Sequence, residues 1–182
     1  MDILFTDKYE IGYTEMKHDI EYRYIPEEDK ERLIESAWQK GINTAQRCRD
    51  RYADAISPEE LAQELGISVV TRTSGPDRIF SEYYSKKKEI RLLRKSIEER
   101  FIPQNVEALT TTEFDHVKHI FIAHELFHHL ECHDPEVGLT YREYLVTVLS
   151  LGPFQRRVGL KCLSEIAAHS FTKAYLGIGH RY

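Results

Sequence analysis

Three short segments rich in β-branched and aromatic residues lie together in the middle of the chain, with helical patterns on both sides. The segments are 67–71, 79–84 and 89–93, and residues 85–88 join the last two. Strands that follow one another without intervening helices do not build a doubly wound parallel sheet. The sequence therefore predicts an α+β fold, in which N-terminal helices precede a small three-stranded sheet and two long helices follow it.

Helical patterns and breaks divide the rest of the chain. Apolar residues spaced three or four apart, a capping box and helix-ending residues predict helices at about 26–51, 57–66, 111–131 and 155–176. A turn is expected at 74–77, and Leu139–Leu151 fits either a helix or a buried strand. Residues 1–25 show no sustained period. Because 182 residues suit one domain, we expect an arm of uncertain conformation at 1–25 and a single domain at 26–182.

The overall charge limits the class of partner. The formal net charge is −5 and the isoelectric point is near 6.0, which argues against a broad nucleic-acid or anionic-membrane surface. Apolar stretches fall short of the ~18 residues that a membrane span needs, and the N-terminus lacks the pattern of a signal peptide. The three cysteines are an odd, sparse set, which favours reduced thiols and an intracellular protein.

The expected helix at 111–131 contains the sequence His124-Glu125-Leu126-Phe127-His128. Histidines four residues apart lie on one face of a helix, so both imidazoles can bind one metal ion. Glu125 can take a proton from a water molecule on the metal and pass it to a leaving amine. Zinc suits such a site because it accepts imidazole and carboxylate ligands and lowers the pKa of bound water to about 7. The spacing therefore predicts a zinc site.

A structural alternative is a pair of core histidines that form hydrogen bonds to the backbone. His124 and His128 fall within the apolar arc of the helix, where buried imidazoles need partners, and a metal ion supplies them. His129 and His133 point away from this face, so we expect them to be solvated or packed near the helix end.

A catalytic zinc needs a third protein ligand, and the sequence offers two candidates. Asp134 follows the motif closely, but Glu131 stands where a metzincin-like turn requires glycine. Glu165 lies on the expected C-terminal helix, and packing of that helix across the first would complete a His, His, Glu site. His169 is four residues further on the same face, where it could stabilise a developing oxyanion or orient a ligand. We expect Glu165 to be the third ligand, with Asp134 as the alternative.

Over roughly residues 50–176 the sequence resembles the ImmA/IrrE family of metallopeptidases, which are gluzincin-like. The resemblance rests on the capped helix that leads into a β-branched strand, on the hairpin, on the histidine motif and on one segment of the last helix. These segments are 57–70, 79–93, 124–128 and 165–171.

The resemblance implies a single metallopeptidase domain in which His124, His128 and Glu165 bind zinc and Glu125 is the general base. It also implies a cytoplasmic protein of a bacterium or a mobile element. Typical members cleave a helix-turn-helix repressor and so switch on genes.

Three classes of function remain in view. The main hypothesis is a zinc-dependent endopeptidase that acts on a protein, with a strand within Ile79–Leu93 pairing with extended substrate backbone. The alternative is a non-catalytic, zinc-containing regulator that binds a partner protein, and the intact Glu125 argues against it. A DNA-binding module is the third. Residues 57–67 resemble the start of a helix-turn-helix, but strand and turn follow where a recognition helix belongs, so we expect no direct nucleic-acid binding.

Overall fold

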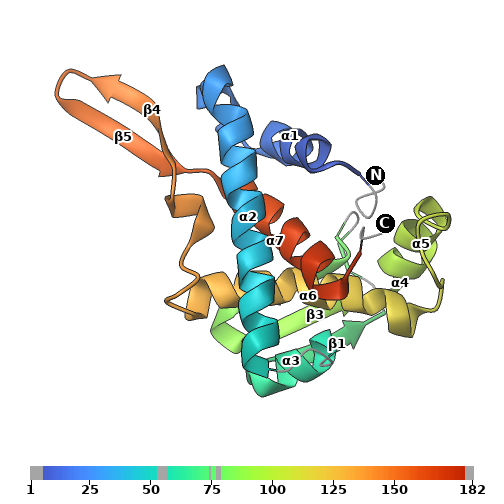
Figure 1. Cartoon of the computed structure of the whole chain (residues 1–182). Coiled ribbons are helices and arrows are strands. Elements are labelled where there is room, and N and C mark those ends of the chain that lie inside the picture. Colours follow the sequence, from blue (N-terminus) through green and yellow to red (C-terminus); the bar gives the residue numbers. More distant parts are fainter. Residues whose placement is uncertain (1–5, 53–56, 74, 77–78, 179–182) are drawn as a thin grey trace.

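Long helices form the centre of the fold (Figure 1). They are α2 (Glu27–Tyr52), α6 (Phe114–His133) and α7 (Lys161–Leu176), and α7 packs against both of the others. This computed structural model describes residues 6–52, 57–73, 75–76 and 79–178. With the two small sheets, the helices make a mixed α+β fold, which confirms the predicted fold class.

Helices α2 and α7 approach closely because small residues line their contact. A Cβ atom on Gly41 would lie 2.3 Å from the carbonyl oxygen of Ala167 and 2.8 Å from the Cβ of Ser170. The Ser170 hydroxyl also donates a 2.6 Å hydrogen bond to the carbonyl oxygen of Trp38. Any side chain at position 41 would push α7 away from α2, and α7 carries Glu165.

Helix α6 runs through the hydrophobic core. The side chains of Leu126 and Phe127 are completely buried, and the ring of Phe127 lies 5.9 Å from that of Phe171 on α7. These residues belong to one apolar cluster that also includes Met16 near the N-terminus. Burial of a large apolar side chain contributes about 1.5–3 kcal/mol, so this cluster sets the position of α6 against α7.

The three-stranded sheet has the order β1-β3-β2. Strand β1 (Ser68–Arg72) is parallel to β3 (Glu89–Leu93), and β2 (Ser81–Tyr84) is antiparallel to β3. The strands lie where the sequence predicts them, although β2 begins two residues later than expected. Strand β2 is an edge strand and lies against α6. The turn expected at 74–77 includes residues 74 and 77, which lie outside the described part of the chain.

Short helical segments connect these parts. Helix α3 (Pro58–Glu64) begins with the predicted capping box, in which Ser57 and Glu60 exchange side-chain and backbone hydrogen bonds. After β3 the chain continues as α4 (Arg94–Ser96), a π-helical turn at Ile97–Phe101 and α5 (Ile102–Gln104). This second segment was not predicted, and it brings Phe101 to the cavity that His124 and His128 line.

The prediction of a helix starting at residue 155 is wrong. Strands β4 (Leu145–Leu151) and β5 (Phe154–Gly159) form an antiparallel hairpin that projects from the helices (Figure 1), and α7 begins only at Lys161. Gly152, with φ of +57°, lies in the turn. The β-branched residues of β4 favour extended backbone, but most of the strand is exposed, so Leu139–Leu151 is not a buried strand.

The expected N-terminal arm contains the helix α1 (Lys8–His18), which packs against α7 and α2. Its apolar residues Ile11 and Met16 are buried, so α1 is part of the same packed body and not a free arm. Among the described residues, the helices lack the combination of length and apolar character that crossing a bilayer requires.

Candidate metal centre

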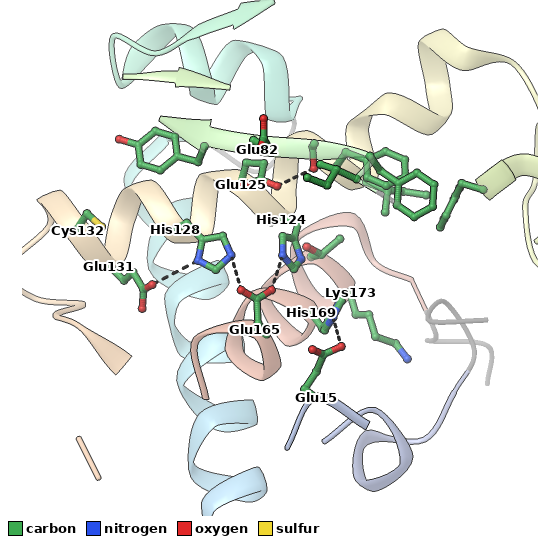
Figure 2. Close-up of a pocket in the computed structure, with 18 of the residues that line it drawn as sticks. Glu15, Glu82, His124, Glu125, His128, Glu131, Cys132, Glu165, His169 and Lys173 are labelled. Atoms are coloured by element: carbon green, nitrogen blue, oxygen red, sulfur yellow. Dashed lines mark hydrogen bonds and ion pairs between the residues drawn. The ribbon is translucent and has the colours of Figure 1, made fainter. Parts of the chain in front are cut away.

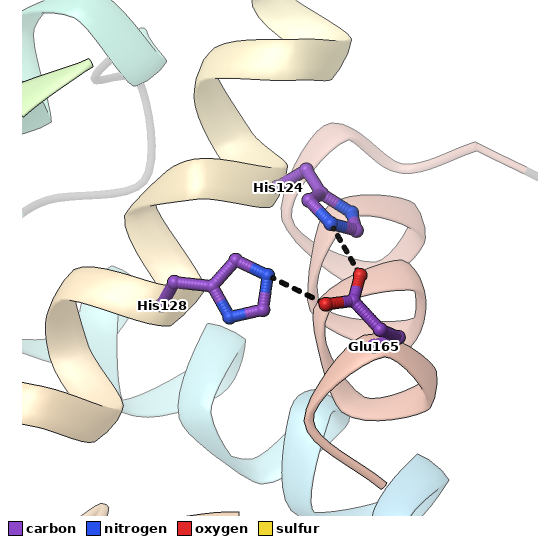
Figure 3. Close-up of side chains that lie close together, drawn as sticks. All are labelled: His124, His128 and Glu165. Carbon is purple, nitrogen blue, oxygen red and sulfur yellow. Dashed lines mark hydrogen bonds and ion pairs between the residues drawn. The ribbon is translucent and has the colours of Figure 1, made fainter. Parts of the chain in front are cut away.

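The two histidines of the motif and one glutamate of α7 point toward one another between α6 and α7 (Figure 3). His124 Nε2 lies 3.2 Å from Glu165 Oε2, and His128 Nε2 lies 3.6 Å from Glu165 Oε1. Successive turns of α6 carry the two imidazoles, whose ring centroids are 5.1 Å apart. The structure therefore brings together the three residues that the sequence predicts as ligands.

The spacing of these donor atoms fits a metal ion. One donor atom from each of the three residues lies within 4.8 Å of the others. Ligands about 2.0–2.1 Å from a tetrahedral zinc ion are about 3.3 Å apart. Two nitrogens and one oxygen form the donor set of a catalytic zinc site, which leaves the fourth position open. The residues present thus fit zinc in number and type, and the two separations between histidine and glutamate, 3.2 and 3.6 Å, are close to the tetrahedral value.

Charge within the cluster favours a cation. Partial burial alone would raise the pKa of Glu165, but His124 and His128 hold it far below its usual range. Burial would lower the pKa of His128, yet its contacts with Glu131 and Glu165 raise it well above the ordinary value. The carboxylates thus attract positive charge to the imidazoles, and either protons or a metal ion can supply it.

Glu131 is a further buried carboxylate at this centre, and its side chain contacts His128 (Figure 2). The Nδ1 atom of His128 donates to Glu131 Oε1 at 3.3 Å, while Glu131 Oε2 accepts from Ser164 Oγ at 2.9 Å and from the Thr140 backbone N–H at 3.2 Å. A proton on Nδ1 leaves Nε2 free to bind a metal. From the sequence, Glu131 was seen only as the residue that replaces the glycine of a metzincin-like turn. Its position three residues after His128, on the same helical face, was the signal that could have revealed this role.

Glu125 points toward the edge strand β2 (Figure 2) and is buried, with 6% of its surface exposed. Its Oε1 atom accepts a 2.6 Å hydrogen bond from the hydroxyl of Ser81 on β2. Ser81 therefore holds the carboxylate that the motif assigns as the general base. Sequence reasoning did not identify Ser81, because its pairing with Glu125 depends on how the sheet packs on α6.

His169 lies beside the cluster on α7, with its ring centroid 4.8 Å from that of His124. Its Nε2 atom lies 3.3 Å from Oε1 of Glu15, which reaches the site from α1 (Figure 2). Burial lowers the pKa of His169, although Glu15 opposes the shift. The N-terminal helix thus contributes to the wall of the site, although residues 1–25 show no sustained pattern in the sequence from which this could be predicted.

The structure places the alternative ligand, Asp134, away from the cluster. Asp134 ends α6, and its Oδ1 accepts from the backbone N–H of Glu136. It lines a different cavity from His124 and His128. His129 is buried, with Nδ1 2.7 Å from the Tyr83 hydroxyl, so it is packed and not solvated.

The cluster opens into a cavity of about 710 Å³ that lies between β2, α6, α7 and α1. Both motif histidines, Glu125, Glu165 and His169 line it. A cavity of this size accommodates several residues of an extended peptide or a drug-sized molecule. The candidate ligands and the candidate base therefore face one shared space that is open to a substrate.

Comparisons of this chain with known protein families, curated proteins and solved structures found no match.

Proposed function

We propose that this chain is a zinc-dependent endopeptidase that hydrolyses a peptide bond in a protein substrate. The observation that carries the proposal is the convergence of His124, His128 and Glu165 within 4.8 Å in the cavity that Glu125 also lines. When bound, zinc supplies Lewis acidity and lowers the pKa of a coordinated water molecule.

The residues of the chain supply the other parts of the reaction. Glu125 accepts the proton of the attacking water and delivers it to the leaving amine. Ser81 holds that carboxylate in place through its 2.6 Å hydrogen bond. Glu131 keeps the Nδ1 proton on His128, and His169 is available to contact the developing oxyanion.

Strand β2 supports a polypeptide substrate over a small molecule. It is at the edge of its sheet, and Ser81, Glu82 and Tyr83 line the cavity. An edge strand offers unpaired backbone groups, to which an extended peptide can add as a further strand. Such pairing would hold the scissile bond next to the histidine cluster.

The resemblance to the ImmA/IrrE metallopeptidases suggests a more specific role. By that analogy the substrate is a helix-turn-helix repressor and the protein acts in the cytoplasm. The net charge of −5 separately argues against direct contact with nucleic acid or an anionic membrane. The alternative is a zinc-containing regulator that binds a partner without cleaving it. The hydrogen-bonded, pocket-facing Glu125 favours catalysis, because a binding protein does not need a positioned base.

Metal content and one substitution test the proposal. Protein purified without added metal should contain one zinc per chain, and the His124→Ala/His128→Ala variant should contain none. Glu125→Gln should keep zinc and lose hydrolysis by roughly 10²-fold or more, because an amide cannot accept the proton. Glu136→Gln makes the same change at an exposed position and serves as the control.

Identification of the substrate completes the test. A cell extract treated with the wild type should gain new peptide termini that are absent after treatment with Glu125→Gln, and the inactive variant should retain the uncleaved substrate. Equal zinc in the wild type and the double variant would refute the metal site. If both the wild type and Glu125→Gln retain the same intact partner, the non-catalytic regulator is the correct function.

A further inference from the structure

The cavity at the metal centre has two chemically different ends. Glu131, Cys132, Ser85 and the hydroxyl-bearing ring of Tyr83 line the part beyond His128, so this end is mainly polar. The part beyond His124 is lined by five apolar side chains from three separate segments. They are Ile79, Phe80, Phe101, Ile120 and Phe121.

Three phenylalanines form the wall of this apolar end. The ring centroids of Phe101 and Phe121 are 4.8 Å apart, those of Phe80 and Phe121 are 5.5 Å apart, and those of Phe80 and Phe101 are 5.6 Å apart. Phe101 and Phe121 are 5% and 7% exposed, while Phe80 and Ile120 are partly exposed. The first two therefore form a fixed floor, and the other two are accessible from the cavity.

The apolar end begins beside the reacting groups. Phe121 precedes His124 by three residues on α6. The two residues are therefore separated by about 4.5 Å along the helix axis, which is less than one turn. Phe80 immediately precedes Ser81, which holds Glu125. Successive residues of an extended peptide are about 3.3 Å apart. A peptide along β2 would therefore place a side chain next to the scissile bond, or one residue beyond it, against these rings.

We infer that this aromatic end is a specificity subsite for a large apolar side chain, aromatic or branched aliphatic, on one side of the scissile bond. The inference rests on the proposed peptidase function and adds the class of side chain that the site selects. Apolar side chains gain from burial against such a wall, and aromatic rings gain more from edge-to-face contact. A carboxylate there would lose its hydration without gaining a hydrogen-bond partner from these five side chains.

Peptide hydroxamates test the subsite directly, because the hydroxamate binds zinc and the neighbouring side chain samples the cavity wall. Four ligands that differ only in that side chain (benzyl, isobutyl, methyl and carboxymethyl) are titrated into the zinc-loaded full chain by calorimetry. The benzyl and isobutyl ligands should bind ten- to a hundredfold more tightly than the methyl ligand. The carboxymethyl ligand should bind most weakly.

Two variants change the subsite without touching the proposed metal ligands. Phe80→Ala should weaken benzyl binding by about tenfold and leave methyl binding unchanged. Ile120→Trp should fill the aromatic end of the cavity, and it should also weaken benzyl binding while leaving methyl binding unchanged. The subsite can therefore be tested even if one of the two variants fails to fold. Phe154→Ala, on the exposed β4–β5 hairpin, makes the same chemical change elsewhere and should alter neither affinity.

The outcomes separate the subsite from the peptidase function. Zinc-dependent binding of all four ligands with equal affinity, or an equal loss for benzyl and methyl ligands in both variants, would overturn the subsite and leave the metal site intact. If the chain cannot be loaded with zinc, the peptidase proposal fails and the subsite fails with it; if the zinc-loaded chain binds none of the four hydroxamates, the subsite alone is overturned.

Discussion

Replacement of Glu131 by glutamine should weaken zinc binding without unfolding the protein. Glu131 is 6% exposed and accepts hydrogen bonds from His128, Ser164 and Thr140. Glutamine has the same shape but carries a donor on one side. If its amide N–H faces His128, it donates to Nδ1 and moves the proton of the ring to Nε2, the atom that would bind the proposed zinc. If the amide N–H turns the other way, it faces the Ser164 hydroxyl and the Thr140 backbone N–H, which are themselves donors, so their hydrogen bonds to this side chain are lost.

Either orientation also removes the negative charge that makes His128 more basic. Loss of a carboxylate that orients a metal-binding histidine costs 10- to 100-fold in metal affinity, or about 1.4–2.7 kcal/mol. Competition with a chromogenic chelator at neutral pH measures this affinity, and urea unfolding of the metal-free protein measures stability separately. Glu136→Gln is the exposed control and should match the wild type in both.

Zinc affinity and stability together show whether Glu131 orients His128 or only packs α6 against its neighbours. If Glu131 only joins α6 to its neighbours, the variant should unfold more easily while its folded form binds zinc normally. Unchanged zinc affinity in a folded Glu131→Gln protein would refute the reasoning, because the orientation of His128 would then not depend on this carboxylate.

Three further predictions follow from the same geometry. Glu165→Ala should lower zinc affinity by more than about a hundredfold, because it removes a proposed ligand and not merely a supporting contact, whereas Asp134→Ala should have little effect. Competition with a chelator measures zinc affinity in both variants. The reverse result would assign Asp134 as the ligand. Ser81→Ala should keep zinc but lower turnover of an identified substrate about tenfold, because the negatively charged carboxylate of Glu125 loses a hydrogen bond. Unchanged turnover would mean that other contacts hold Glu125 in place. Burial, with His133 and Lys88 nearby, lowers the pKa of His129 to about 4, so the unfolded chain takes up this proton near pH 6.5 and the folded chain does not. Stability should therefore fall as the pH drops from about 6.5 to 4, by on the order of 3 kcal/mol from this residue, and urea unfolding of His129→Phe should show a correspondingly smaller fall.

Local chemistry in the sequence predicted most of the helices and the three-stranded sheet. The capping box at Ser57 and Glu60 and the β-branched strands act over a few residues, so their structures did not depend on distant contacts. The hairpin of β4 and β5 was missed because Gly152 and Pro153 interrupt an apolar stretch in which helix and strand were both possible. Mostly exposed strands also lack the burial pattern that usually identifies them.

The same distinction applies to the site. The spacing of His124 and His128 brings two imidazoles to one helical face because an α-helix has 3.6 residues per turn, so two of the three candidate ligands were evident in the sequence. The same local rule could have shown that Glu131 lies near His128. The sequence could not show that Ser164 and Thr140 hold Glu131 in place.

The sequence alone determined the α+β class, because it depends on local patterns of helix and strand. It also determined the histidine pair and the adjacent glutamate, because their spacing lies within a single helix. Only the tertiary structure shows that Glu165, and not Asp134, lies beside the two histidines, since that placement depends on how α7 crosses α6. The crossing is set by contacts far apart in the chain, among them the close approach of Gly41 to Ala167 and the packing of Phe127 on Phe171. Tertiary packing also decides two other features, the hydrogen bond between Ser81 and Glu125 and the wall of three phenylalanines. Each joins segments that meet only when the core is packed.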